Sequence, residues 1–314
     1  MENEKPITVY AAIVSNLVIA IMKFIVTFIT GSSAMLAEAI HSTADTGNEL
    51  LLLLGIHQSR KPVDETHPMG HGRELYFWGL IVAITLFSSG AGMSIYEGVT
   101  GLSHPSEVKN VIWNYAVLGV SFVAEGISWI IVFKKFLHQK KANESSWQSL
   151  RTSKDPSLFL VLGESTAALA GLLVAFVGVF LAQLLHSHYP DVIASIIIGL
   201  ILATVSIYLV YESKSLLIGE SADFEVVTHV QDLVQNHPAV AKAQRPLTIH
   251  LSPKEVFLAL DVQFKPDLRA SELIGIVDEL ERKIHQEHPN VGHIFIEIER
   301  LKRSDNKQDH DGSV

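Results

Sequence analysis

The second long apolar stretch of this chain, residues 34–56, carries four ionisable side chains: Glu38, His41, Asp45 and Glu49. An ionisable side chain at the centre of a membrane helix costs about 2.5–3.5 kcal/mol on insertion scales, so such residues are rare there and usually line a pathway. His41 and Asp45 are four residues apart, which places them on the same face of a helix, one turn apart. The stretch therefore predicts a membrane helix with a chemically active face.

An imidazole and a carboxylate at this spacing are half of a tetrahedral site for a divalent metal such as zinc. The competing interpretation is that each is an interior group hydrogen-bonded to a neighbouring helix. Two such groups at ligand spacing in one span favour metal binding. The chain has no cysteine, which excludes disulfides and thiolate metal sites. Any metal ion must be held by His, Asp and Glu.

The composition is that of a helical membrane protein with a polar appendage. Of 314 residues, 48% are hydrophobic and 18% are charged, whereas soluble domains have roughly 25% charged residues. The net charge of -9 disfavours a nucleic-acid partner and favours cations. Apolar segments of spanning length predict six transmembrane helices, at about 7–29, 34–56, 75–102, 111–136, 158–185 and 192–218.

The basic residues predict how these helices are oriented. The connections after the second and fourth segments are rich in Lys and Arg, whereas those after the first, third and fifth hold only Lys109. By the positive-inside rule, both basic connections and both termini lie in the cytoplasm. The first apolar run is too long for a signal-peptide core, so it should remain as a helix. The basic residues concerned are Arg60, Lys61, Arg73, Lys134, Lys135, Lys140, Lys141, Arg151 and Lys154.

After a transmembrane domain at 1–218, the composition changes to that of a small soluble α+β domain at 219–302. Hydrophobic periodicity predicts the order αββαβ, a helix-on-sheet sandwich, with Ser271 able to cap the second helix. Residues 303–314 are expected to form a disordered polar tail. The predicted elements are a helix at 224–236, strands at 240–251 and 256–264, a helix from 271 to about 285, and a strand at 291–298.

The connection before the third segment holds a second candidate metal site. Asp64, His67 and His71 form a compact set of oxygen and nitrogen ligands, and Gly70 and Gly72 let the backbone fold around it. The alternative is a polar turn at the membrane interface.

The fifth segment has one charged residue, Glu164, followed by Ser165. Small residues after them allow close packing against another helix, so Glu164 could meet His41 and Asp45. Glu125, in the fourth segment, is equally compatible with packing or a proton relay and is left outside the primary site.

Together these features resemble the cation diffusion facilitator family, over about residues 7–299. The resemblance is carried by the His41-x-x-x-Asp45 pair, the His67-Pro68-x-Gly70-His71-Gly72-x-x-Glu74 loop and the αββαβ domain. It implies a homodimeric antiporter, not an enzyme, that exchanges divalent metal ions for protons by alternating access in a lipid bilayer. It implies Zn²⁺ as the transported substrate, with Fe²⁺, Mn²⁺ and Cd²⁺ as other candidates, and a location in the bacterial inner membrane.

The motif His41-Ser42-x-x-Asp45-Thr46-x-Asn48, together with Asp155-Pro156-Ser157 and the Glu164 segment, resembles the branch that includes the mitochondrial zinc exporters of animals and their bacterial relatives. In most of the family, the second and fifth spans each supply two ligands, and the second-span pair corresponds to His41 and Asp45. This branch has Glu-Asp where the present chain has Glu164-Ser165. The resemblance therefore implies that Glu164 is a ligand and that a bidentate Glu164, or a water held near Ser165, completes the site.

The same resemblance extends to the cytoplasmic parts. Asp64, His67 and His71 match loop ligands of members that export iron and zinc. The positions of a metal pair at the dimer interface correspond to Asp261, Glu297 and Glu299, with His250 and His293 nearby, although solvated strand faces are the alternative there.

Two other functions agree with a membrane protein that binds metal. A cation channel would need a filter of carbonyls or charged rings, and the sequence contains no pattern of that kind. A membrane-anchored metal sensor would need strong ligands in its soluble domain, and those are weaker than the ligands predicted in the membrane.

Overall fold

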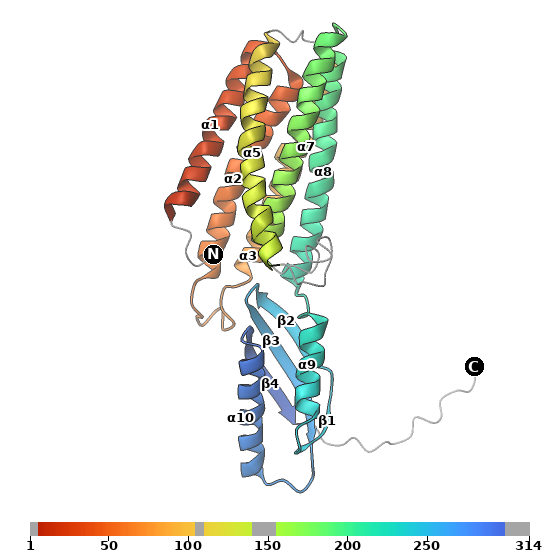
Figure 1. The fold of residues 1–314 in the computed structure, drawn as a ribbon. Coiled ribbons are helices and arrows are strands. Elements are labelled where there is room, and N and C mark those ends of the chain that lie inside the picture. Colours follow the sequence, from red (N-terminus) through yellow and green to blue (C-terminus); the bar gives the residue numbers. More distant parts are fainter. Residues whose placement is uncertain (1–5, 104–109, 140–154, 299–314) are drawn as a thin grey trace, which may run out of the picture. The chain divides into compact units, whose positions relative to one another are not determined.

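A computed structural model describes residues 6–103, 110–139 and 155–298, which form two compact units that meet between Ile218 and Gly219 (Figure 1). The expected tail at 303–314 and Glu299 lie outside the described residues. So do five of the basic residues used to predict orientation: Lys109, Lys140, Lys141, Arg151 and Lys154.

The first unit is a bundle of long helices. The third predicted segment is one rod with a π-helical insertion, because α3 continues through η1 into α4. The elements are α1 Pro6–Thr30, α2 Ser33–Ser59, α3 Glu74–Thr85, η1 Leu86–Gly92, α4 Met93–Ser103, α5 Val111–Gln139, α7 Pro156–Leu184 and α8 Tyr189–Ile218.

Four of these rods are long and apolar enough to cross a membrane: Glu74–Ser103, Val111–His138, Pro156–Leu184 and Tyr189–Ile218. The predicted count of six is therefore not confirmed. In α1, the apolar stretch within the described side chains is short, at Asn16–Thr30. In α2, carboxylates interrupt the apolar sequence.

The start of α2 is held by a side chain from α8. Gly31 turns the chain with a φ of 69°, and Ser32 caps the helix by accepting a hydrogen bond from Met35 N. The Asp191 carboxylate accepts from Ser32 Oγ at 2.6 Å and from Ser33 N at 2.7 Å. A carboxylate at a helix N-terminus satisfies free amides and stabilises the helix dipole. This contact joins elements more than 150 residues apart.

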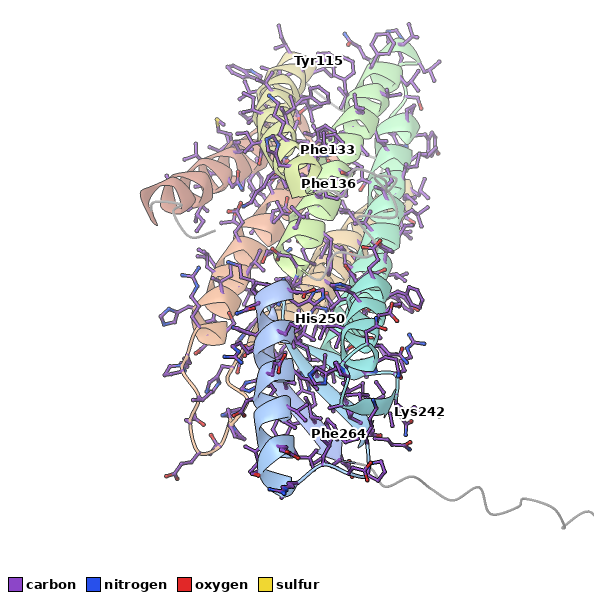
Figure 2. The ribbon with its side chains drawn as sticks, turned by 60° about the horizontal axis from the view of Figure 1, so that its bottom comes forward. Tyr115, Phe133, Phe136, Lys242, His250 and Phe264 are labelled. Atoms are coloured by element: carbon purple, nitrogen blue, oxygen red, sulfur yellow. The ribbon has the colours of Figure 1, made fainter. Side chains whose placement is uncertain are left out.

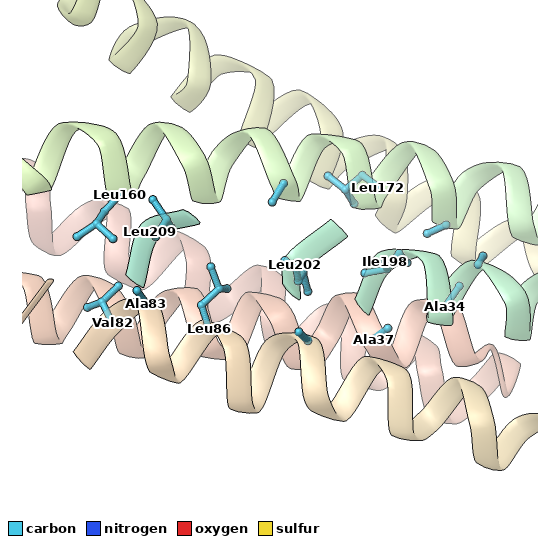
Figure 3. Packing of buried hydrophobic residues seen from close by; sticks show 14 of the residues in the cluster. Ala34, Ala37, Val82, Ala83, Leu86, Leu160, Leu172, Ile198, Leu202 and Leu209 are labelled. Carbon is cyan, nitrogen blue, oxygen red and sulfur yellow. The ribbon is translucent and has the colours of Figure 1, made fainter. Parts of the chain in front are cut away.

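Small residues let the helices approach closely in the apolar core. A Cβ atom on Gly199 of α8 would lie 2.9 Å from Ile95 N and 3.0 Å from Ala91 O. The reverse contact places Gly98 of α4 against the backbone of α8. Figure 3 shows the buried side chains between the helices, among them Ala34, Ala37, Leu86, Leu160, Ile198, Leu202 and Leu209.

Helix α5 packs mainly against α7. Phe136 lies in a small cluster with Leu158 and Leu162, next to the partly buried Phe133 (Figure 2). Tyr115, near the other end of α5, donates to Gln183 Oε1 at 3.1 Å. These contacts hold α5 beside the helix that carries Glu164.

The second unit has three strands before its second helix, so the predicted order αββαβ is wrong and the observed order is αβββαβ. The segment expected as one strand divides at residues 244–246, where Pro246 lacks the N–H that would continue the ladder. The elements are α9 Phe224–Gln235, β1 Val240–Ala243, β2 Leu247–Ser252, β3 Glu255–Phe264, α10 Ala270–Glu287 and β4 Val291–Ile298.

Strand β3 lies at the centre of a mixed sheet. Strands β1 and β2 pair with it antiparallel, and β4 pairs with it parallel. Its residues alternate strictly between partly buried and buried, which is the two-residue period of a strand with one face in the core. The prediction that Ser271 caps α10 is wrong: Arg269 is the N-cap, and its amide donates to Glu272 Oε2 at 2.7 Å.

We predict that Gly199→Ala lowers the stability of the bundle, because the added methyl would collide with backbone atoms of α4. Overpacking of this kind costs about 1–3 kcal/mol, more than alanine's helix propensity returns. Gly126→Ala on α5 is the matched control, since a Cβ there would meet nothing within 4 Å. Thermal unfolding of the detergent-solubilised protein tests this. Equal melting temperatures for the two variants would contradict the close crossing.

Candidate metal-transport site

His41 and Asp45 lie inside the bundle with unused ligand atoms. His41 Nδ1 and Asp45 Oδ1 are 3.2 Å apart, and neither of these atoms, nor His41 Nε2, has a hydrogen-bond partner among the described residues. Two ligands about 2.0 Å from a tetrahedral zinc ion would be roughly 3.3 Å apart. The pair therefore has the separation needed to hold one ion between its two side chains.

The side chain of Glu164 on α7 contacts α2 about one helical turn beyond Asp45. Asn48 Nδ2 donates to Glu164 Oε1 at 2.7 Å, and the negative charges of Glu164 and Asp45 interact directly. The structure thus brings Glu164 within electrostatic range of the His41–Asp45 pair, although among the described residues only the loop group has three ligand atoms within 4.8 Å of one another. The sequence analysis gave Asn48 no role, although its position three residues after Asp45 places it on the same helix face.

Ser165 is not brought to this group by any hydrogen bond within the described residues. Its side chain is 8% exposed. Successive residues on a helix point about 100° apart, so Ser165 and Glu164 face different directions. The next residue, Thr166, accepts a hydrogen bond from Trp129 Nε1 of α5 at 3.0 Å.

Two more carboxylates lie in the electrostatic neighbourhood of the site. Glu49 of α2 accepts a hydrogen bond from Asn16 Nδ2 of α1 at 2.7 Å. Glu125 of α5, left outside the primary site on sequence grounds, interacts through its charge with Asp45, Glu49 and Glu164. Such a concentration of negative charge favours a cation.

The sequence analysis missed one charged residue of this region, Lys23. Its Nζ donates to Glu38 Oε2 at 3.0 Å and to Ser42 Oγ at 2.7 Å, and all three side chains are buried. The sequence signal was present, since Lys23 is the only basic residue of the first apolar segment.

The loop residues Asp64, His67 and His71 meet as predicted, with ligand atoms that all lie within 4.8 Å of one another. Asp64 Oδ1 accepts from the amides of Thr66 and His67 at 2.9 and 2.7 Å, which closes a turn. Asp64 Oδ2 lies 2.9 Å from His71 Nε2. Asp64 Oδ1 also lies 3.3 Å from His67 Nδ1, so each carboxylate oxygen is beside an imidazole and Oδ1 closes the turn as well. Gly70, with a φ of 75°, lets the chain turn back.

Hydrogen bonds from Thr66, His71 and the His67 backbone hold the pKa of the Asp64 carboxyl well below its usual range. The ionised form is favoured in the folded state, so its contribution to the turn is complete above the ordinary carboxyl pKa of about 3.9. That contribution is lost only as the pH falls below this value. Asp64 is therefore ionised throughout the pH range in which a metal ion would bind.

In the second unit, only part of the expected group is assembled. Asp261 of β3 is the register partner of Glu297 of β4. His250 is buried on β2 opposite Val256, near the start of β3 (Figure 2). His293 lies opposite Phe257, with its Nε2 3.4 Å from Glu255 Oε1. Neither imidazole is placed at the Asp261–Glu297 pair, which leaves two carboxylates.

Comparison with known proteins relates both units to one family. The profile described as cation efflux transmembrane domain matches residues 9–218, and that described as cation efflux protein, cytoplasmic domain, matches residues 222–301.

The names of several individual relatives describe metal transport. The mitochondrial proton-coupled zinc antiporter SLC30A9 of Xenopus laevis is 33% identical over 86% of this chain and 55% of its own length, and the human protein is 35% identical over 74% and 41%. The manganese efflux system protein MneP of Bacillus subtilis is 26% identical over 91% and 93%. The chain thus spans about half the length of its zinc-antiporter relatives.

We predict that His71→Ala lowers the zinc content of the purified protein by one ion per protomer, since it removes a ligand and leaves the turn at Asp64 Oδ1 intact. Metal analysis after equilibration with zinc and desalting measures this. His57→Ala, an exposed histidine at the end of α2, is the matched control and should not change the content. An unchanged stoichiometry in His71→Ala would mean that the loop is only a polar turn.

Proposed function

The chain belongs to the cation efflux family, and we propose that it exports divalent metal ions, zinc first, across a membrane in exchange for protons. One observation carries the proposal: the unpartnered ligand atoms of His41 and Asp45 lie inside an apolar bundle at the separation of two zinc ligands. A buried polar atom without a hydrogen bond is costly. The lack of hydrogen bonds to these atoms of His41 and Asp45 is explained if a cation binds to them during each transport cycle.

Glu164 is the third ligand of the proposed site. Asn48 donates to its Oε1, which orients the carboxylate and leaves Oε2 free to face the ion. A hydrogen-bonded partner of this kind is typical behind metal ligands. The fourth position would be filled by a bidentate Glu164 or by a water held near Ser165, because zinc at a transport site must keep an exchangeable ligand.

Proton exchange follows from the chemistry of the ligands. An imidazole binds metal only when neutral and a carboxylate only when ionised, so the ion and protons compete for the same atoms. The ion would enter from the cytoplasm, lose water to His41, Asp45 and Glu164, and leave on the other side after the helices rearrange. The π-helical η1, which packs against α2 and α8, is a candidate hinge, since π-segments often mark functional positions.

The ligand set supports zinc over manganese. Imidazole is a suitable ligand for zinc, whereas manganese prefers sites built from oxygen ligands alone. The imidazole of His41 in the proposed site therefore favours zinc. The two kinds of relative, zinc antiporters and a manganese efflux protein, make Mn²⁺ the first competitor to test, followed by Fe²⁺ and Cd²⁺.

We further propose six spans, with α1 and α2 completing the bundle and the loop at 60–73 in the cytoplasm. The Bacillus relative, aligned over 93% of its length, supports a bacterial plasma membrane. A homodimer is supported by the open face of the second unit's sheet, where the rings of Phe257 and Phe295 lie with centroids 5.4 Å apart and planes tilted by 34°, and Phe295 is 56% exposed. Asp261 and Glu297 would lie near that interface.

We predict that His41→Ala, Asp45→Asn and Glu164→Gln each reduce zinc export by at least about 100-fold, because even changes behind the ligands cost roughly 10–100-fold. Glu164→Gln preserves the acceptor for Asn48, so its fold should persist. Zinc flux in sealed vesicles with an imposed pH gradient measures the effect. Glu97→Gln, a carboxylate on α4 near Ser33, is the control and should export normally. Wild-type flux in His41→Ala would show that the site is elsewhere.

We also predict that Ser165→Asp tightens zinc binding by about tenfold at pH 8, since a second buried carboxylate would add negative charge close to the ion even though the side chains of residues 164 and 165 point about 100° apart. The gain should be smaller at pH 6, because neighbouring carboxylates hold a proton that the ion must displace. Isothermal titration at both pH values measures this, with Ser165→Ala as the control. If Ser165→Asp leaves the affinity unchanged, Ser165 faces away from the ion and the fourth ligand must come from another helix.

A further inference from the structure

The buried lysine of α1 lies next to the proposed transport site and has no part in the function argued so far. Lys23 Nζ contacts Glu38 Oε2 and Ser42 Oγ, and the side chains of Lys23 and Glu38 are 2% and 0% exposed. In the described helices of the first unit, the other Lys residues, Lys134, Lys135 and Lys214, lie within six residues of a helix end. Lys23 is therefore a cation held deep in the bundle.

The pair is not explained by stability alone. Removing two charges from water has a large desolvation penalty, and replacing a buried ion pair by apolar residues is often neutral or stabilising. Ionisable groups retained inside a membrane bundle usually mark an ion pathway. Lys23 also attracts Asp45 and Glu125, so its charge acts on the site itself.

Glu38 is incompletely satisfied. Its Oε1 has no hydrogen-bond partner among the described residues and lies against Gly171 of α7, where a Cβ would be only 2.5 Å away. The glycine thus leaves space for this oxygen. Glu38 precedes His41 by three residues, so the unpartnered atoms of Glu38, His41 and Asp45 follow one another along one face of α2.

We propose that Glu38 and Ser42 form a second binding station for the transported divalent cation, and that the Lys23 ammonium occupies this station whenever the ion is absent. The inference rests on the proposed export function. In the orientation proposed above, α2 begins at the outer side with Ser33, so Glu38 lies between the His41–Asp45 pair and the exit.

The Lys23 ammonium would compete with the metal ion for the oxygens of Glu38 and Ser42. Ser42 lies at the level of the His41–Asp45 pair and Glu38 lies further out, so an ion that leaves the pair meets the Ser42 hydroxyl and then the Glu38 carboxylate only while Lys23 has withdrawn. When Lys23 returns to Glu38, its positive charge repels the ion and replaces it at the carboxylate. Lys23 would thereby weaken metal binding at the exit and speed release.

The test is the neutral substitution Lys23→Met, with Lys23→Gln as a second variant that can still donate a hydrogen bond if the methionine variant does not fold. Without the competitor, Glu38 is free to bind zinc. If the station is free about a tenth of the time in the wild type, the Kd for zinc should fall about tenfold. The maximal export rate should fall as well, because release becomes slow, so KM and kcat decrease together.

The double variant Lys23→Met/Glu38→Gln separates this role from a structural one. It removes the added ligand together with the competitor, so the Kd for zinc should return close to the wild-type value. Asn16→Leu is the control, since it breaks a different polar contact between α1 and α2, with Glu49, and should leave the Kd unchanged.

Isothermal titration with zinc and flux measurements over a range of zinc concentrations, on the full chain, give these constants. An unchanged or weaker Kd in both single variants overturns the inference, as does a tighter Kd that persists in the double variant. His41→Ala in the same assays separates the two proposals. If the wild type exports zinc and His41→Ala does not, an unaltered Lys23→Met refutes the second station alone; if the wild type does not export zinc, the proposed function fails.

Discussion

Ionisable and amide side chains inside an apolar helix bundle must find partners on other helices, and this requirement organises the first unit. Asp191 of α8 binds the start of α2. Further along α2, Lys23 and Asn16 of α1 hold Glu38 and Glu49, and Asn48 meets Glu164 of α7. Each contact satisfies a group that would be costly in hydrocarbon. Together they set the register of α1, α7 and α8 against α2.

His41 and Asp45 are the exception to this pattern, and the exception is where function is expected. Natural structures rarely leave buried polar atoms without partners, so unsatisfied groups call for an explanation. Here both ring nitrogens of His41 and one oxygen of Asp45 lack a partner among the described residues, whereas Glu38, Asn48 and Glu49 each use one side-chain atom in a hydrogen bond and leave another without a partner. A site that must bind and release a cation needs ligands that no permanent hydrogen bond has already saturated.

Close packing supports this arrangement. The glycines of α4 and α8 bring two helices into backbone contact, and Gly171 of α7 leaves room for an oxygen of Glu38. Bulky residues at these positions would separate the helices and draw the ligands apart. The apolar core in Figure 3 therefore positions the polar face of α2 as well as stabilising the bundle.

The sequence alone predicted the positions of the long helices, the closeness of His41 to Asp45 and the grouping of Asp64, His67 and His71, because these depend on hydropathy and on spacing within a single segment. The alternation of β3 and the grouping of Asp64, His67 and His71 followed from the same local rules. Local rules failed where a distant segment decided the outcome. The pairing of β1 and β2 with the same strand, β3, is one such outcome, although Pro246 was a local signal that the expected strand at 240–251 would divide. The position of His250 and His293 away from the Asp261–Glu297 pair is another.

Only the tertiary structure decided which buried groups meet. Nothing in the spacing of α1 showed that Lys23 would bind Glu38, or that Asn48 would hold Glu164, since such pairs depend on how helices rotate and slide against one another. The sequence shows that a charged residue lies in an apolar segment, where burying the charge is costly. Which residue becomes its partner depends on how the helices pack against one another.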